Sequence, residues 1–386
     1  MSHFPLTPVR LGALVLSFLF ACALTAQSFR AVAPFTNENG KLLTEVSING
    51  IKGRFLLDTG APTCVSHSFA QKAGLSLGET LRGSDSNGQS VATQLVTIPA
   101  LQFGDATFTQ LQALCWEKGN PTEAFIDGII GYNLMQLGTS IFDLRRQRFT
   151  FTTDTRPHNP EAERYALPLL GGKAYPYIPI RFEGQPADTV MFDSGAADFY
   201  EMSTRRFARL SPADSLGVRL LAKGTGVLSM GAAGIERPSE KHRLLISSLA
   251  LAEAKFHNVT SITTSANDSR IGSELLTHGI VVIDYPQRKF YFLPYTPDSI
   301  PDLYVKEWDV VITVTDGHLT AGMVWYEQLP IRSGDRIVAV NGQRFDKVDL
   351  RTAVTQGLFA MPGDTATITF LNPRTQREER IEIGRR

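Results

Sequence analysis

Two aspartates, Asp58 and Asp193, are the residues of this sequence best suited to chemistry. Each opens a D-[ST]-G-A segment directly after an apolar run: Asp58-Thr59-Gly60-Ala61 and Asp193-Ser194-Gly195-Ala196. One such segment is usually a polar turn, but two in matching surroundings indicate a site. Two carboxyls held about 3 Å apart cannot both be ionised, so they share one proton and act as acid and base together. Hydrolysis of an amide bond needs both groups.

The two segments occupy the same place in an internal repeat, residues 41–152 and 174–293. Near the end of each copy, Gly131 precedes Asp143 by 12 residues and Gly272 precedes Asp284 by 12. Each copy also predicts a short helix, at residues 66–73 and 203–210, and a hairpin. The hairpins pair residues 91–98 with 101–108 and residues 244–251 with 256–262. The pattern predicts two small, mostly β barrels that supply one aspartate each.

The repeat resembles the retropepsin-like aspartic proteases over about residues 41–293. In that family a D-[ST]-G-A loop packs against a later apolar-apolar-Gly segment in each half, and a proton shared by two aspartates is the established arrangement. The matching segments here are Ile129-Ile130-Gly131 and Arg270-Ile271-Gly272. The charge of Arg270 departs from the pattern. The family's halves are usually separate subunits, whereas here they lie in one chain, which implies that a monomer suffices for catalysis.

The resemblance implies that the two aspartates are catalytic and that residues 59–61 and 194–196 form the supporting loops. The hydroxyls of Thr59 and Ser194 can lock the loops to each other by hydrogen bonds. Gly60 and Gly195 permit a tight backbone and place N–H groups near the carboxylates.

The positions after the two glycines hold Ala61 and Ala196, whereas many pepsin-type enzymes have a hydroxyl residue there. Neither alanine side chain can donate a hydrogen bond to stabilise an ionised carboxylate. We therefore expect the dyad to keep its shared proton toward neutral pH.

Substrate closure in the family comes from a flap hairpin, and two glycine-containing stretches fit that role. Residues 86–89 form a hairpin tip in the first copy, and residues 230–234 are their counterpart in the second. The flap candidates are Asn87, Gly88 and Gly231. A plain surface turn is the alternative.

The sequence changes character after Tyr295. Residues 333–342 resemble the G-D-x-I-x-x-V-N-G signature of PDZ domains, with strands expected at 310–314, 323–325 and 366–371 and a helix at 350–358. An unrelated β-rich module is the alternative. The PDZ resemblance implies a C-terminal peptide ligand bound by strand addition. However, residues 317–319 are a poor version of the carboxylate-binding loop, so a structural or regulatory role is also open.

The first 26 residues predict a signal peptide, because Arg10 precedes an apolar run at 11–24 and small residues follow. The run is too short to span a bilayer comfortably. We expect export to the periplasm, the cell envelope or the medium. A buried helix is one alternative, and lipidation of Cys22 in a lipobox-like stretch is another. Cys64 and Cys115 then remain, either as a disulfide or as buried free thiols.

The composition and motifs of the sequence limit the classes of binding partner to be expected. Lys+Arg and Asp+Glu both number 38, so the net charge is zero and neither nucleic acid nor an anionic membrane is indicated. The sequence contains neither H-E-x-x-H nor G-x-S-x-G, and we expect no metal and no cofactor. The partners expected are peptide or protein substrates.

The predicted architecture is mainly β: two retropepsin-like closed β-barrel lobes related by a pseudo-two-fold axis, followed by a small PDZ-like α+β domain. The parts are the signal peptide at 1–26, a lobe at 27–152, a linker at 153–173, a lobe at 174–295 and the PDZ-like domain at 303–386. The predicted function is that of an exported aspartic endopeptidase. The alternative is an inactive peptide- or protein-binding protein on the same fold, against which the retention of both aspartates argues.

Overall fold

The computed structural model describes residues 28–154, 160–172, 174–183, 187–210, 217–266, 268–349, 353 and 361–386. The predicted signal peptide, Cys22 and nearly all of the helix expected at 350–358 lie outside these ranges. The chain is mainly β, which confirms the predicted fold class. In these ranges, no helix has both the length and the apolar character needed to cross a membrane.

The strands of the first repeat close into a barrel. Going round it, each strand pairs with the next and the last pairs with the first: β3 (Lys41–Ile48), β4 (Ile51–Leu57), β9 (Gly128–Ile130), β5 (Cys64–Val65), β8 (Ala106–Trp116) and β7 (Ser90–Phe103). The predicted hairpin is confirmed as β7 and β8, both longer than expected. The predicted helix is α1 (His67–Lys72), whose first turn is capped by the Ser66 hydroxyl.

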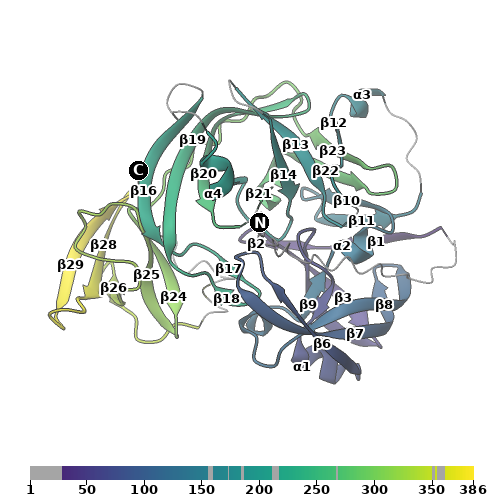
Figure 1. The fold of residues 1–386 in the computed structure, drawn as a ribbon, viewed down its shortest axis with the longest axis horizontal. Helices are drawn as coiled ribbons and strands as arrows, with labels where there is room; N and C mark the ends of the chain where they lie inside the picture. The colour runs from purple at the N-terminus through teal and green to yellow at the C-terminus, as the bar shows by residue number, and fades with distance from the viewer. Residues whose placement is uncertain are drawn as a thin grey trace, which may run out of the picture.

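The second repeat shows the same cycle of pairings. Its strands, in the corresponding order, are β13 (Tyr177–Phe182), β14 (Asp188–Phe192), β21 (Ser269–Ile271), β15 (Tyr200–Ser203), β20 (Ala254–Thr264) and β19 (Ser239–Leu251). The predicted hairpin is β19 and β20, and the predicted helix is the short α4 (Thr204–Phe207), capped by the Ser203 hydroxyl. Figure 1 shows the first barrel, purple to blue, below the second, which is teal to green.

A sheet formed by strands of both repeats joins the two barrels. Its order is β1 (Arg30–Pro34), β11 (Arg148–Thr152), β10 (Thr139–Asp143), β22 (Gly279–Asp284), β23 (Lys289–Pro294) and β12 (Ala166–Pro168). At its centre Ile141 faces Val282. These two residues are equivalent positions of the repeat, because they are 141 residues apart, the same separation as between Gly131 and Gly272. The axis that relates the barrels therefore passes through this pair. Strand β12 lies in the segment expected to be a linker.

Aromatic side chains fill the space beneath this sheet. The ring of Phe142 lies 4.8 Å from that of Phe149 and 6.1 Å from that of Phe192, and Phe192 lies 5.5 Å from Phe290. All four are fully buried and belong to one apolar core that includes residues of both barrels. Burial of such rings is among the largest contributions a side chain makes to folding.

Further elements complete the two barrels. They are β2 (Thr36–Glu38), β6 (Leu77–Ser84), η1 (Pro121–Ala124), α2 (Tyr132–Met135), α3 (Pro160–Glu163), β16 (Val218–Gly226), β17 (Met230–Gly231), β18 (Gly234–Ile235) and η3 (Ser273–Thr277). Strand β6 extends the first barrel along β7, and β16 extends the second along β19.

The C-terminal part has its own apolar core, to which Val310, Ile337 and Phe370 contribute. Its strands are β24 (Val310–Thr315), β25 (His318–Val324), β26 (Ile337–Val340), β27 (Gln343–Arg344), β28 (Thr365–Leu371) and β29 (Glu378–Gly384). Thr315 pairs with His318, so Asp316 and Gly317, both with positive φ, form a tight two-residue hairpin turn. The stretch weighed as a carboxylate-binding loop is thus the turn and the first part of β25.

The C-terminal part is joined to the second barrel by strand pairing. Strand β25 pairs with β16, and the Val227 N–H donates to the Gly322 carbonyl over 2.9 Å. A Cβ atom on Gly226 would lie 2.2 Å from that same carbonyl oxygen, so only glycine permits this approach. Figure 1 shows the yellow-green strand β25 beside β16.

Replacing Gly226 by Val should therefore separate β16 from β25. We expect amide hydrogen exchange at Val227 and Val324 to accelerate at least about tenfold, because the pairing that protects them is lost. Gly83→Val in β6 is the matched control, since a Cβ there meets no atom within 4 Å. Unchanged exchange in the Gly226 variant would show that this pairing does not hold the two parts together.

Candidate active site

Each aspartate is presented by the end of one strand and held by a parallel neighbour. Asp58 follows β4 and donates its N–H to the Ile130 carbonyl of β9 over 3.0 Å. Asp193 follows β14 and donates its N–H to the Ile271 carbonyl of β21 over 2.8 Å. The apolar-apolar-Gly segments thus pack on the D-[ST]-G-A loops in both repeats.

The ends of the two loops are held in an equivalent way. The Ala61 carbonyl accepts from the Tyr132 N–H and the Ala196 carbonyl accepts from the Ser273 N–H, each over 2.9 Å. A Cβ on Gly131 would lie 2.2 Å from the Ala61 carbonyl oxygen. This glycine is therefore required by close backbone contact.

The side chains of Thr59 and Ser194 lock the two loops together. The Thr59 hydroxyl donates to the Phe192 carbonyl over 2.6 Å and accepts from the Ser194 N–H over 3.0 Å. Reciprocally, the Ser194 hydroxyl donates to the Leu57 carbonyl over 2.9 Å and accepts from the Thr59 N–H over 3.0 Å. Both side chains are fully buried. Each loop therefore satisfies its buried polar groups through the other barrel.

This arrangement brings the two carboxyl groups next to each other, because each loop's glycine lies against the carboxyl of the other loop. The Gly60 N–H donates to Asp58 over 2.8 Å and the Gly195 N–H donates to Asp193 over 3.0 Å. The Ala196 N–H adds a donor to Asp193 over 3.2 Å, which the sequence reasoning missed because it considered only the side chain at this position. A Cβ on Gly60 would lie 2.6 Å from the carboxyl carbon of Asp193, and one on Gly195 would lie 2.4 Å from that of Asp58.

The environment favours a protonated Asp58. Burial raises the pKa of Asp58 above its ordinary value, and the charge of the neighbouring Asp193 raises it further. The Gly60 N–H and the charge of Lys41 act in the opposite direction and are outweighed. A carboxyl that stays protonated beside a second carboxyl is the electrostatic condition for an acid–base pair.

Lys41 belongs to the site although nothing in the sequence marked it. It lies at the start of β3, and its ammonium group donates to the Gly195 carbonyl over 2.5 Å. The preceding turn also contacts the second barrel, where the Ser273 hydroxyl donates to the Gly40 carbonyl over 2.6 Å. The first barrel thus supports the loop that carries Asp193.

Arg270 is the other charged residue at the site, and here the sequence did give a signal. One guanidinium nitrogen lies 3.5 Å from a carboxylate oxygen of Asp193, and another lies 2.6 Å from Glu201. The residue is only 7% exposed. The charge that interrupts the apolar-apolar-Gly pattern is therefore buried in ion pairs and does not disrupt the packing of β21.

The two flap candidates contact each other. In the first tip, Asp85 accepts from the Asn87 and Gln89 N–H groups, and Gly88 takes a positive φ. The other carboxylate oxygen of Asp85 accepts from the N–H of Ala233, in the second tip, over 3.0 Å. Three further hydrogen bonds link the two sides: Ser229 to Asn87, Gln89 to Ile235 and Asn120 to Ala232. Gly231 lies against Asp85, which a Cβ there would meet at 2.3 Å.

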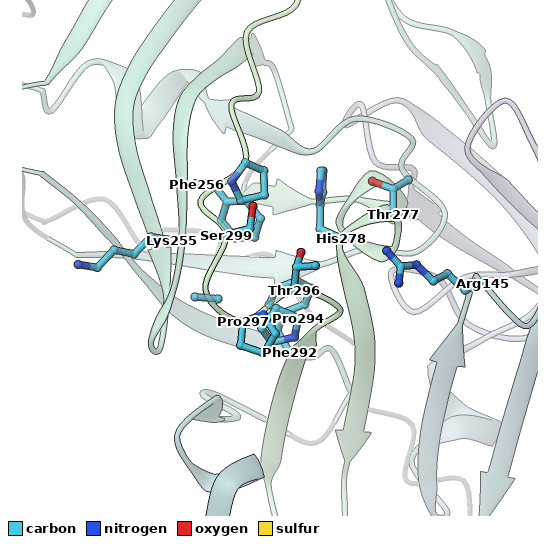
Figure 2. Close-up of a pocket in the computed structure, with 12 residues that line it drawn as sticks. Arg145, Lys255, Phe256, Thr277, His278, Phe292, Pro294, Thr296, Pro297 and Ser299 are labelled. Carbon is cyan, nitrogen blue, oxygen red and sulfur yellow. The ribbon is translucent and has the colours of Figure 1, made fainter.

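A separate hollow lies away from the two loops. Figure 2 shows Arg145 on one side of it, with His278, Phe256 and a group of prolines around it. Its lining residues are Arg145, Ala254, Lys255, Phe256, Thr277, His278, Phe292, Pro294, Thr296, Pro297, Ser299 and Pro301. Since no residue of the D-[ST]-G-A loops lines it, the hollow does not contribute to the dyad.

Cys64 and Cys115 are free thiols and both are buried, so the disulfide alternative is not what the structure contains. Burial and the nearby Asp58 raise the pKa of the Cys64 thiol, which keeps it protonated.

The comparisons with known proteins agree with this site. The family model described as aspartyl protease matches residues 44–134, which include Asp58 and Gly131. A search of curated proteins found no match. The match supports an aspartyl protease-like domain in this part of the chain and a protease-like function. The Asp193 loop lies outside the matched residues.

Removing the Ser194 hydroxyl should weaken the contact between the barrels. Ser194→Ala leaves the Thr59 N–H and the Leu57 carbonyl buried without these partners, at a cost of about 2–4 kcal/mol in the free energy of unfolding. Urea unfolding measures this loss. Thr59→Ser, which keeps its hydroxyl, is the control, with an expected loss under about 1.5 kcal/mol. Equal stability of the Ser194 variant and the wild type would contradict the locking role.

Proposed function

We propose that this protein is an exported aspartic endopeptidase, in which Asp58 and Asp193 are the catalytic residues. The observation that carries the proposal is that the two carboxyls lie next to each other, each following a strand of a different barrel. The aspartyl protease match to residues 44–134 supports the same chemistry. The export part rests on residues 1–26 alone, and a mature N-terminus after residue 23 or 26 would support it.

The pair would act on a water molecule and a peptide bond held between the barrels. The ionised carboxyl removes a proton from water while the resulting hydroxide attacks the carbonyl carbon, and the protonated carboxyl donates its proton to the carbonyl oxygen. The carboxyl that took the proton from water then donates it to the nitrogen, while the other carboxyl takes a proton back from a hydroxyl of the tetrahedral intermediate. The C–N bond breaks, and the pair returns to its starting state. The N–H groups of Gly60 and Gly195 orient the two carboxyls throughout.

One chain supplies both carboxyls, so we propose that the monomer is sufficient and that its partners are peptides or proteins. A C-terminal peptide ligand of the PDZ-like domain remains part of the proposal on sequence resemblance alone. Strand addition at β24, which ends the described sheet, would be the mode of binding. Titration of short peptides with free and amidated C-termini tests it, and equal binding of both would contradict carboxylate recognition.

Asparagine at either aspartate should abolish turnover, because the pair needs one ionised and one protonated carboxyl. We expect a loss of about a thousandfold or more for both Asp58→Asn and Asp193→Asn, measured with a mixed peptide library with and without pepstatin. Asp105→Asn, at the β7–β8 turn, is the control.

Near-normal activity in either variant would exclude the two-aspartate mechanism, and an inactive wild type that still binds peptides would favour the alternative of a binding protein. Repeating the assay at falling protein concentration checks the monomer. A steep loss of activity per molecule would indicate an obligate dimer.

We further propose that the two hairpin tips, together with the residues that flank them (85–89 and 229–235), form a lid that opens to admit substrate. Asp85→Asn keeps the oxygen that caps its own turn but replaces the oxygen that accepts from Ala233 by an NH₂ group. The closed lid should weaken, so KM should rise several-fold and hydrogen exchange across 230–235 should accelerate. Asp85→Ala, which removes both oxygens, should do more. A KM and exchange rate equal to those of the wild type would contradict the lid.

A further inference from the structure

The strands that lie beside the two aspartate-bearing strands carry different residues at the equivalent position. Arg270 pairs with Met191, two residues before Asp193, and Ile129 pairs with Leu56, two residues before Asp58. The positions are therefore equivalent in the two barrels. One holds a cation and the other an apolar side chain, so the barrel pair is nearly symmetric in its backbone and asymmetric in its charge.

The Arg270 cation is directed at Asp193 by its own contacts. Its guanidinium group lies 3.5 Å from Asp193 and 2.6 Å from Glu201 of β15, and it also lies 3.5 Å from the Thr264 hydroxyl. Arg270 is 7% exposed and Asp193 is 6% exposed. At this burial a charge interaction over 3.5 Å is weakly screened by solvent.

We propose that Arg270 fixes the position of the shared proton: it holds Asp193 in the ionised form, as the base that activates water, and leaves the proton on Asp58. Glu201 moderates this effect by neutralising part of the Arg270 charge. Arg270 is thus a positioning residue that acts through Asp193. The inference rests on the proposed function for its catalytic meaning, but the location of the proton can be measured without turnover.

Of the other groups that face the pair, Lys41 opposes this assignment and the backbone N–H donors favour it. Lys41 of β3 donates to the Gly195 carbonyl, and its charge lowers the pKa of Asp58. Burial nonetheless dominates at Asp58, whose pKa is raised. Asp193 accepts two N–H donors, from Gly195 and Ala196, whereas the Gly60 N–H is the donor that the structure gives Asp58 among its described residues. Donors to a carboxylate stabilise its ionised form.

The signs of the expected effects follow from charge. Replacing Arg270 by Met removes a positive charge, so both ionisation steps of the dyad should move to higher pH, by roughly 1–2 pH units. Replacing Glu201 by Gln removes a negative charge and frees Arg270 to act on Asp193, so the steps should move to lower pH, by roughly half a unit to one unit. Arg270→Lys keeps the charge and should shift them least.

The experiment is a pH titration of the full chain labelled with ¹³C at the aspartate carboxyl carbons, followed by NMR. Asp58→Asn and Asp193→Asn identify the two signals. In the wild type, Asp193 should be the carboxyl that ionises first, and the two charge variants should shift its titration in opposite directions. Arg206→Met is the matched control, because it removes an arginine ion-paired with Asp188 on the same barrel.

Three outcomes would overturn the proposal: Asp58 ionising before Asp193, both charge variants shifting the titration in one direction, or neither shifting it more than Arg206→Met. If Arg270→Met does not fold, Glu201→Gln alone decides by the sign of its shift. Where the protein cleaves peptides, the acidic limb of the pH–rate profile should follow the same shifts. Shifted titrations in a protein without turnover would retain this inference and remove the proposed function.

Discussion

The reciprocal hydrogen bonds between Thr59 and Ser194 are the interaction on which the rest of the structure depends. They satisfy buried backbone groups in loops that end in the middle of the molecule, where water cannot substitute for them. Neither barrel can complete its own loop, because the partners lie in the other. The same contact sets the separation of the two carboxyls. The same hydrogen bonds therefore position the two aspartates and hold the two barrels together.

The joining sheet makes that contact specific. A one-residue slip between β10 and β22 would turn every side chain of one strand to the opposite face, and the buried rings of Phe142 and Phe192 would lose their packing. Because Ile141 faces its own counterpart Val282, the register also fixes the axis about which the loops meet. The sheet and the loops lie on the same axis, and each constrains the other.

The sequence predicted the elements whose signals are local or repeated. The short helices at 66–73 and 203–210, the hairpins and the D-[ST]-G-A loops follow from patterns of a few residues, and the repeat supplied the comparison between them. The pairing of β16 with β25 was not predictable in this way, since it joins residues about a hundred positions apart. Its only sign in the sequence is the pair of glycines at 224 and 226, where the two strands approach closely. Lys41 was missed because its contact depends on how the barrels are placed. Arg270 was noticed as an exception, but its partner Glu201 could be identified only in three dimensions.

Fusion of the two halves into one chain gives this fold a freedom that a symmetric dimer lacks. In a dimer of identical subunits, any cation placed beside one aspartate is also placed beside the other, and both carboxyls are stabilised equally in the ionised form. In the fused chain the second half can carry Arg270 while the first keeps Ile129. The same freedom allows β25 to pair with β16 of the second barrel, whereas β6, the counterpart of β16 in the first barrel, is the last strand of its sheet among the described residues. Backbone symmetry builds the site, and the differences between the halves can then assign distinct roles to its two carboxyls.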